Sequence, residues 1–243
     1  MDRVIAVIPA RYGSTRFPGK PLARLAGKPL LQWVYEAALS AKFLNEIIVA
    51  TEDERIADLA RSLGAKVAMT SPDHTSGTDR VAEAVQGKRA VAVVNIQADE
   101  PLIEGWMIDR LLPPLLSGEA DISSLMARVD NLSLLSDCNR VKVVVDRKGN
   151  ALYFSRSPVP FEAKDFFYQH IGVYGFRREV LEAFCRLQPS RLEGSERLEQ
   201  LRALENGYRI RMIEIPAPTI GVDTPEDLAQ AEIFLEKRRY EKD

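Results

Sequence analysis

Short apolar runs alternate with amphipathic segments along the first hundred residues of this chain. The runs are rich in Val and Ile and lack polar alternation, which is typical of parallel strands covered on both faces. They span residues 4–8, 47–50, 67–70 and 91–96. Between them, apolar residues at three- and four-residue steps predict helices over 29–40, 53–63 and 78–86. This alternation predicts a doubly wound α/β arrangement.

The pattern changes in the second half of the chain. Apolar runs predict strands over 121–129, 141–145, 151–155, 169–176 and 208–215, with a turn at 147–150 that makes the second and third of these a hairpin. A period of two places His170, Tyr174 and Phe176 on one face of their strand. Helices are predicted over 195–206 and from Pro225 onwards, the latter capped by Thr224 with Asp227. We therefore expect a mixed, mainly parallel sheet in a single domain spanning 1–243, with a small lobe at roughly 120–215.

Composition narrows the class of protein. The chain has 243 residues, 46% of them hydrophobic, and a net charge of −2, which argues against a nucleic-acid partner. Its two cysteines, Cys138 and Cys185, are far apart and lack the spacing of a metal site, which fits a reducing compartment. No apolar run approaches the roughly 18 residues of a membrane span, and no signal-peptide pattern opens the chain. We expect a cytoplasmic protein without membrane insertion.

The segment after the first predicted strand, residues 8–22, carries three cations and no acid. Arg11, Arg16 and Lys20 lie in it together with Gly13 and Gly19. A loop at the carboxyl end of the first strand of a doubly wound sheet is a usual ligand site, and glycines let backbone amides approach an anion closely. A solvated basic loop is the alternative. The position and the absence of acids favour a polyphosphate site.

This basic loop is not a P-loop. That motif needs Ser or Thr directly after its Gly-Lys pair, whereas here Pro21 follows Gly19 and Lys20. Pro21 also disfavours helical backbone at Lys20, so we expect no helix there and an extended segment that lets Lys20 reach across a triphosphate.

Two aspartates follow later strands. Asp99 ends the run after strand 91–96 and would lie beside the basic loop if the first and fourth strands are neighbours. Asp223 precedes the last helix. Each could instead be a helix cap, although Thr224 can cap the last helix in place of Asp223. Carboxylates facing a triphosphate need a cation between them, which makes Mg²⁺ the natural cofactor.

Several motifs resemble those of the 3-deoxy-manno-octulosonate (Kdo) cytidylyltransferases. They occur in order along nearly the whole chain, at 8–11, 14–16, 18–21, 73–80, 97–101, 151–156, 170–175, 198–202 and 221–228. The resemblance implies a nucleotide-diphospho-sugar transferase-like three-layer α/β/α sandwich, usually homodimeric. It also implies Mg²⁺-dependent transfer of CMP from CTP to the anomeric hydroxyl of Kdo, giving CMP-Kdo and pyrophosphate for lipopolysaccharide biosynthesis.

The resemblance also implies roles for individual residues. Arg11, Arg16 and Lys20 would contact the triphosphate, and Asp99 and Asp223 would hold Mg²⁺, with Arg11, Lys20 and Asp99 as the catalytic set. The remaining nucleotide-binding residues would be Pro9, Ala10, Ser14, Ser71, Ser76, Gly77, Thr78, Arg80 and Gln97. The sugar-binding residues would be Arg156, His170, Tyr174, Glu199 and Gln200.

One position departs from the family pattern. Ala98 stands where that pattern has glycine before the aspartate, which bears on the choice of sugar rather than on the class of reaction. Three alternatives remain open at this point: a cytidylyltransferase for the 8-amino analogue of Kdo, a transferase for another acid sugar such as an acylneuraminate, and a non-catalytic nucleotide sensor. Retention of both strand-end aspartates counts against the sensor.

Overall fold

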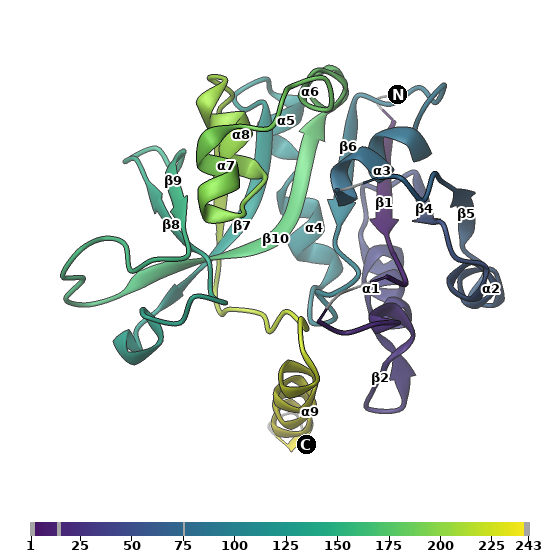
Figure 1. The fold of residues 1–243 in the computed structure, drawn as a ribbon, viewed down its shortest axis with the longest axis horizontal. Coiled ribbons are helices and arrows are strands. Elements are labelled where there is room, and N and C mark those ends of the chain that lie inside the picture. The colour runs from purple at the N-terminus through teal and green to yellow at the C-terminus, as the bar shows by residue number, and fades with distance from the viewer. Residues whose placement is uncertain (1–2, 14–15, 75, 241–243) are drawn as a thin grey trace. The chain divides into compact units, whose positions relative to one another are not determined.

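The computed structural model describes residues 3–13, 16–74 and 76–240 (Figure 1). The chain forms two compact units. The first comprises Met1–Ala90, Val94–Asp109 and Thr219–Asp243, and the second comprises Val91–Val93 and Arg110–Pro218. The single domain with a lobe at about 120–215 stays a prediction.

Four strands form the sheet of the first unit, in the order β6-β1-β4-β5. Their bounds are β1 Val4–Pro9, β4 Glu46–Thr51, β5 Lys66–Met69 and β6 Ala92–Ile96. β1 pairs parallel with β4, and β4 with β5. Every residue of β1 is buried, as its unbroken apolar sequence requires. Because β6 lies next to β1, the expected adjacency of the first and fourth predicted strands is confirmed.

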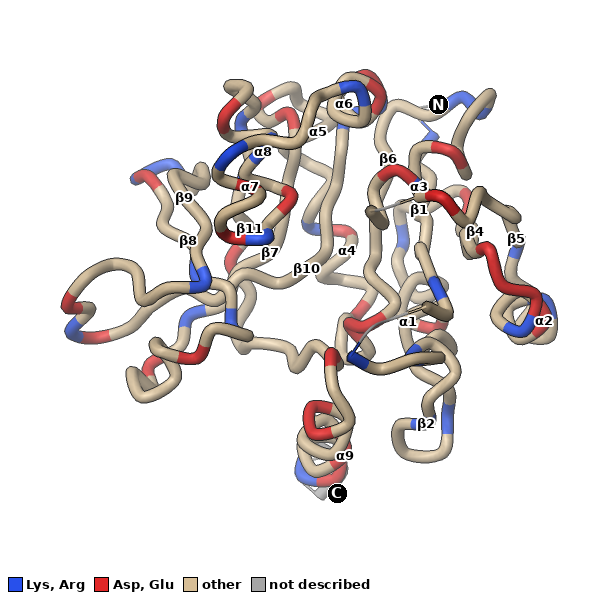
Figure 2. The backbone as a smooth tube through the Cα atoms, viewed as in Figure 1, with Lys and Arg blue, Asp and Glu red and all other residues tan. Residues whose placement is uncertain are grey.

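Helices flank these strands (Figure 1). They are α1 Leu30–Ser40, α2 Glu54–Ser62, α3 Gly77–Ala84, α4 Gly105–Arg110 and α9 Pro225–Tyr240. α2 is capped by the Asp53 side chain, which accepts from the Arg55 N–H. The predicted start of the third helix at Thr78 is wrong by one residue, because Ser76 is the N-cap and accepts from the Asp79 N–H. Figure 2 shows charged residues of both signs along α2 and α9.

The second unit contains a mixed sheet in the order β11-β7-β10, with β8 pairing both β10 and β9. The strands are β7 Ile122–Val129, β8 Lys142–Val145, β9 Ala151–Ser155, β10 Phe167–Arg177 and β11 Ile210–Ile215. β11 runs parallel to β7, whereas β10, β8 and β9 pair antiparallel. The short helices are η2 Leu132–Leu134, α5 Pro113–Leu116, α6 Arg178–Phe184, α7 Arg191–Glu196 and α8 Gln200–Glu205.

The single helix predicted over 195–206 is wrong, because the chain there forms the end of α7 and then α8. Arg197 takes a left-handed conformation with φ 55°, and its N–H donates to the Glu193 carbonyl, which ends α7. The reversal lets Leu198 and Leu201 become buried. Burial of these two leucines in the tertiary structure therefore overrides the local helical periodicity.

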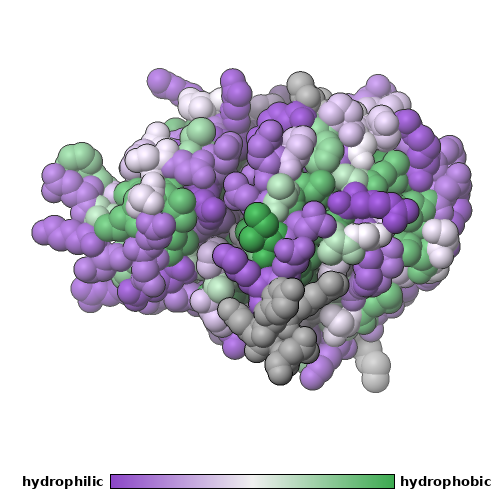
Figure 3. All heavy atoms as spheres, turned by 90° about the horizontal axis from the view of Figure 1, so that it is seen from below, coloured by the Kyte–Doolittle hydropathy of each residue, from purple (hydrophilic) through white to green (hydrophobic). Residues whose placement is uncertain are grey.

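The face in Figure 3 is mainly hydrophilic, and the described helices are too short or too polar for a membrane span. Hydrophilic residues cover most of the face shown in Figure 3, with separate, smaller hydrophobic patches. Within the described part of the chain, none of the helices combines the length and the apolar character that a membrane span needs.

Candidate functional site

The loop after β1 contains an element that the sequence did not predict. Residues Lys20–Leu22 form a short 3-10 helix, η1, so the expected extended segment at Lys20 is wrong. Gly19 precedes it with φ 69°, and its carbonyl accepts from the Leu22 N–H at 2.9 Å. Pro21 is tolerated because the first turn of a helix needs no N–H from it. Ser14, one of the predicted nucleotide-binding residues, lies outside the described residues.

Lys20 joins the two strand-end aspartates. Its Nζ donates to Asp99 Oδ2 at 2.6 Å and to Asp223 Oδ1 at 3.1 Å. Arg16 Nη2 lies 3.0 Å from the other oxygen of Asp223. Three residues assigned to one site from separate motifs are therefore in direct contact in the first unit, across 79 and 203 residues of sequence.

Charge and burial have opposite effects on the pKa values of Lys20 and Asp223. Burial of the Lys20 ammonium lowers its pKa, but the carboxylates of Asp99 and Asp223 outweigh that effect, so the pKa of Lys20 lies above its ordinary value. Burial raises the pKa of the Asp223 carboxyl, but Lys20 and then Arg16 outweigh it, so that pKa lies below its ordinary value. Lys20 is therefore cationic and Asp223 anionic at neutral pH.

Backbone and core contacts hold the two aspartate-bearing segments together. The Val222 N–H donates to the Asp99 carbonyl at 2.8 Å, and Thr219 Oγ1 donates to Glu100 Oε2 at 2.9 Å. Val222 is itself fully buried in a hydrophobic cluster with Leu25, Leu30 and Ala231. Sequence reasoning included Glu100 in the 97–101 motif but gave it no role, and it did not identify Thr219.

Asp223 does not cap α9. The Asp227 carboxylate accepts from the Thr224 N–H at 2.9 Å and from the Asp223 N–H at 3.0 Å, while Thr224 Oγ1 accepts from the Asp227 N–H. The predicted capping box is thus confirmed. Because Thr224 and Asp227 satisfy the end of the helix, the carboxylate of Asp223 is left to face Lys20 and Arg16.

A pocket of about 150 Å³ adjoins this cluster in the first unit. Most of the residues that line it were predicted to bind nucleotide or metal, and they come from β1, α3 and the segments beside them and after β6. The lining residues are Pro9, Ala10, Arg11, Pro21, His74, Ser76, Gly77, Arg80, Gln97, Ala98 and Asp99. The structure therefore brings four separate sequence motifs, 8–11, 18–21, 73–80 and 97–101, to one cavity.

The start of α3 meets the end of β6 closely. A Cβ on Gly77 would lie 3.4 Å from the Gln97 amide and 3.5 Å from Pro9, in van der Waals contact with both. Gln97 Nε2 donates to Asn95 Oδ1 at 2.9 Å, and Asn95 Nδ2 lies 3.4 Å from the buried Thr78 hydroxyl. Gly77 thus lies beside a connected set of amide and hydroxyl groups on Gln97, Asn95 and Thr78.

Arg80 is the most buried charged residue lining the pocket, with 4% of its surface exposed. Its Nη2 lies 2.8 Å from Glu52 Oε2, and its Nη1 donates to the Thr70 hydroxyl. Sequence reasoning missed Glu52, which lies between β4 and α2 and carries no motif of its own. A buried guanidinium needs such a carboxylate because an unpaired buried charge is costly.

Ser71 and His74 are held by one carboxylate. Glu83 Oε2 accepts from the Ser71 N–H at 3.0 Å and contacts His74 Nε2. The pKa of the Glu83 carboxyl is lowered, mainly by the contact with His74 and to a smaller extent by the Ser71 N–H. The segment between β5 and α3 is therefore fastened to α3.

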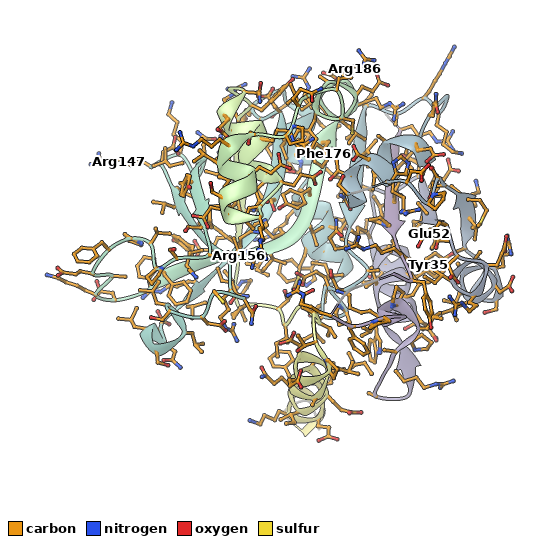
Figure 4. The ribbon with its side chains drawn as sticks, viewed as in Figure 1. Tyr35, Glu52, Arg147, Arg156, Phe176 and Arg186 are labelled. Carbon is orange, nitrogen blue, oxygen red and sulfur yellow. The ribbon has the colours of Figure 1, made fainter. Side chains whose placement is uncertain are left out.

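The predicted sugar-binding residues belong to the second unit. Arg156, labelled in Figure 4, directly follows β9, and its Nε donates to the Glu196 carbonyl at 3.0 Å while its Nη1 donates to the Cys138 carbonyl at 3.0 Å. The Glu196 carboxylate accepts from the Arg156 N–H at 2.8 Å and from Ser155 Oγ at 2.7 Å. Glu196, which sequence reasoning did not identify, therefore fixes the position of Arg156.

His170 and Tyr174 are neighbours, with ring centroids 5.3 Å apart. Tyr174 also lies 6.1 Å from Phe176, so the predicted common face of these side chains on β10 is confirmed. His170 Nε2 and Ser124 Oγ are 2.9 Å apart. Burial lowers the pKa of His170 to about 3, so its ring is neutral at physiological pH.

Glu199 and Gln200 lie at the start of α8. Gln200 is buried, and Glu199 Oε1 lies 3.9 Å from Arg202 Nη2. Arg202 is held mainly by Glu193, at 2.5 and 2.8 Å. Contacts to a sugar by these residues, and by Arg156, His170 and Tyr174, stay predictions.

Asp99 and Asp223 are the residues that could hold a metal. No cluster of three or more His, Cys, Asp or Glu suited to a metal ion occurs among the residues that the structure describes. Mg²⁺ typically takes one or two protein carboxylates and completes its octahedral shell with water and substrate phosphate. Both carboxylates contact the same cation, Lys20 Nζ, and they supply the oxygen donors that such an ion prefers.

Comparison with known proteins places this arrangement in a family. The family model described as Cytidylyltransferase matches residues 5–212. A 3-deoxy-manno-octulosonate cytidylyltransferase of Solibacter usitatus is 50% identical over 232 residues, covering 93% of this chain and 92% of that protein. One of Geobacter metallireducens is 48% identical over 241 residues, covering 93% and 95%. This chain belongs to the 3-deoxy-manno-octulosonate cytidylyltransferase family.

A solved structure agrees with this family assignment. A CMP:2-keto-3-deoxy-manno-octonic acid synthetase complexed with CTP is 39% identical and superposes with a TM-score of 0.91 over 98% of this chain and 100% of that chain. The predicted α/β class, a three-layer arrangement of helices about a mixed, mostly parallel sheet, is confirmed. Membership of the cytidylyltransferases makes this chain a nucleotidyltransferase, which rules against the sensor considered from sequence.

Proposed function

We propose that this protein transfers CMP from CTP to the anomeric hydroxyl of Kdo, releasing pyrophosphate. The observation that carries the proposal is the contact of Lys20 with both Asp99 and Asp223 beside the pocket that Gly77, Arg80 and Gln97 line. The names of the relatives and the CTP complex of the solved neighbour support the choice of substrates. A transferase for another acid sugar has no comparable support.

The residues around Lys20 suit the charge changes of this reaction. The sugar hydroxyl must attack the α-phosphorus while pyrophosphate leaves, so catalysis depends on positioning and on neutralising negative charge. Lys20 and Arg16 both contact the Asp223 carboxylate, and Arg11 lines the adjoining pocket. On binding of CTP, we expect Lys20 to exchange its carboxylate partners for phosphate oxygens.

That exchange would leave the carboxylates of Asp99 and Asp223 to hold Mg²⁺. When bound, Mg²⁺ would neutralise phosphate charge and lower the pKa of the attacking hydroxyl. Asp99 would position the reacting groups, since Val222 fixes its backbone and Glu100 fixes the neighbouring segment. A dedicated histidine base is then unnecessary, in keeping with the neutral, buried ring of His170.

The two units would bind different parts of the substrates. The cytosine would lie in the pocket at the start of α3, with Arg80 directed to its carbonyl oxygen and Ser71, Ser76 and Thr78 near by. The second unit would bind the sugar, with Arg156 pairing its carboxylate and His170, Tyr174, Glu199 and Gln200 meeting its hydroxyls. A homodimer in the cytoplasm completes the proposal; Cys138 and Cys185 are not joined in a disulfide, which is compatible with a reducing compartment.

Pyrophosphate release tests the proposal directly. With Mg²⁺, CTP and freshly prepared Kdo, we expect rapid release, and much less with UTP or with N-acetylneuraminate. Fresh sugar is required because the rare β-anomer is the expected substrate. The 8-amino analogue of Kdo belongs in the same panel, since it differs at one substituent. Absence of release with Kdo under these conditions would overturn the assignment.

A further inference from the structure

Glu52 uses its two carboxylate oxygens to contact two different parts of the nucleotide site. It directly follows β4 in the first unit (Figure 4). Its Oε1 accepts from the Tyr12 N–H at 3.1 Å, and its Oε2 lies 2.8 Å from Arg80 Nη2. Its side chain is 19% exposed, so both contacts are largely shielded from water. No motif and no role implied by the family resemblance includes this residue.

The first of these contacts anchors the basic loop. Tyr12 follows Arg11, and its carbonyl accepts from the Gly19 N–H at 2.9 Å, which closes the loop just before Lys20. The Arg55 guanidinium lies over the Tyr12 ring, 3.4 Å from its centroid. Gly19 packs against the same ring, because a Cβ there would lie 3.0 Å from it. Tyr12 therefore connects the loop to the segment between β4 and α2.

The second contact orients the cation at the other end of the pocket. Arg80 is 4% exposed and lines the pocket that also contains Arg11 and Gln97. Its guanidinium forms an ion pair with Glu52, and its Nη1 donates to the Thr70 hydroxyl. Loss of the Glu52 charge would leave a buried cation without its anionic partner and free it to change its orientation.

We propose that Glu52 is a positioning residue that couples the cytosine end of the nucleotide site to its triphosphate end. It does so by holding Arg80 and the Tyr12 backbone with one carboxylate. The inference rests on the proposed function for the identity of the two ends. It adds a residue outside the motifs whose substitution should change nucleotide affinity without removing any group that touches the nucleotide.

Two substitutions separate the two contacts. Glu52→Gln keeps an oxygen that can accept from the Tyr12 N–H but loses the charge facing Arg80, whereas Glu52→Ala loses both. We expect Glu52→Gln to weaken binding of CMP about 10-fold and binding of inorganic tripolyphosphate less than about 2-fold, in calorimetric titrations. We expect Glu52→Ala to weaken the binding of both CMP and tripolyphosphate. Equal weakening of the two ligands by Glu52→Gln would overturn the inference.

A double-mutant cycle tests whether the effect passes through Arg80. In an Arg80→Lys background, Glu52→Gln should add less than about 2-fold to the loss of CMP affinity, because the geometry that it maintains is already gone. Additive losses would contradict the proposal. Glu52→Asp, which keeps the charge, should lose less CMP affinity than Glu52→Gln; an equal or greater loss also counts against it. This milder variant gives a result even where Glu52→Gln does not fold.

Steady-state kinetics distinguish a positioning role of Glu52 from a simple loss of folded enzyme. A positioning role predicts a raised KM for CTP in Glu52→Gln with kcat nearly unchanged, whereas simple loss of folded enzyme would lower kcat at constant KM. Glu54→Gln is the matched control, because Glu54 is an exposed acid two residues away that pairs with Arg61. Failure of the wild-type chain to bind CMP would instead overturn the proposed function, and this inference with it.

Discussion

At the scale of single residues, the most consequential feature is one ammonium group between two carboxylates. Lys20 neutralises Asp99 and Asp223 in the free protein, which would otherwise repel each other and any approaching triphosphate. The same contact lowers the pKa of the Asp223 carboxyl and holds both carboxylates in place. Under the proposed function, substrate phosphate would compete for the lysine, and the carboxylates would become available to a divalent ion.

Substitution of Asp99 tests the metal role. We expect Asp99→Asn to lower kcat at least about 100-fold in the presence of Mg²⁺, while CTP affinity measured without metal changes less than about 3-fold, because a neutral amide is a poor ligand for a hard cation. Turnover assays and metal-free titration give the two values. Asp58→Asn, on an exposed face of α2, is the control. Equal losses in turnover and metal-free binding would argue against a metal ligand at Asp99.

In the second unit, Lys142 holds several backbone carbonyls together. Lys142 is fully buried, and its Nζ donates to the carbonyls of Asp137, Arg140 and Arg156. Burial lowers the pKa of this ammonium, although the Asp137 carboxylate opposes the shift. The three carbonyls include that of Arg156, so Lys142 helps to position the proposed sugar carboxylate site.

Lys142→Met should therefore affect both stability and sugar binding. The free energy of unfolding should fall by about 3 kcal/mol, because three partly buried carbonyls lose the donor that Lys142 supplies. In the folded fraction, KM for Kdo should rise more than KM for CTP. Chemical denaturation and initial rates measure these effects, with Lys148→Met in the exposed turn after β8 as the control. A stability as high as that of the control would contradict the structural role of Lys142.

At the scale of elements, the break between α7 and α8 decides which side chains the second unit presents. Arg197 adopts a left-handed backbone, which L-residues other than glycine and asparagine rarely take. The break allows Glu193 to pair with Arg202 while Glu196 accepts from Arg156 and Ser155. A continuous helix over 195–206 could not provide both sets of contacts from the same residues.

Arg197→Gly should consequently stabilise the protein. Glycine takes φ 55° without a Cβ clash, so we expect the free energy of unfolding to rise by about 0.5 kcal/mol after the entropic cost of glycine is included. Ser195→Gly, within α7, should instead lower it by about 0.5 kcal/mol. Denaturant titration of the two variants compares them directly. Destabilisation by both would show that the left-handed backbone at 197 carries little strain.

At the scale of the whole molecule, burial of His170 makes stability depend on pH. Its folded-state pKa is about 3, below the ordinary value of 6.5, so between these values the unfolded chain binds a proton that the folded protein excludes. Stability should therefore be complete above about pH 6.5 and decline as pH falls toward about 3, by at most about 1.4 kcal/mol per pH unit.

His170→Gln should flatten this dependence between pH 6.5 and 5, where carboxylates contribute little. Thermal or denaturant unfolding at three pH values measures the slope, and His74→Gln, which alters the other histidine, serves as the comparison. An unchanged slope in His170→Gln would mean that another group excludes the proton.

The amino-acid sequence by itself determined much of the local structure and the chemical candidates. Its apolar runs predicted β1, β4, β5 and β6 to within about one residue at each end, because strands covered on both faces need unbroken hydrophobic sequence. The acid-free loop and the strand-end aspartates predicted a polyanion site, because charge and position along the chain are local properties. The ordered motifs predicted the family.

The tertiary structure decided which of these candidates meet and what holds them. The contact of Lys20 with Asp223 spans 203 residues, and the bridge from Glu52 to Tyr12 and Arg80 joins three segments without a shared motif. Local preference also failed at Lys20, where Gly19 starts a 3-10 turn, and at Arg197, where burial of Leu198 and Leu201 broke a helix. Such contacts depend on packing between distant segments, which neither periodicity nor composition encodes.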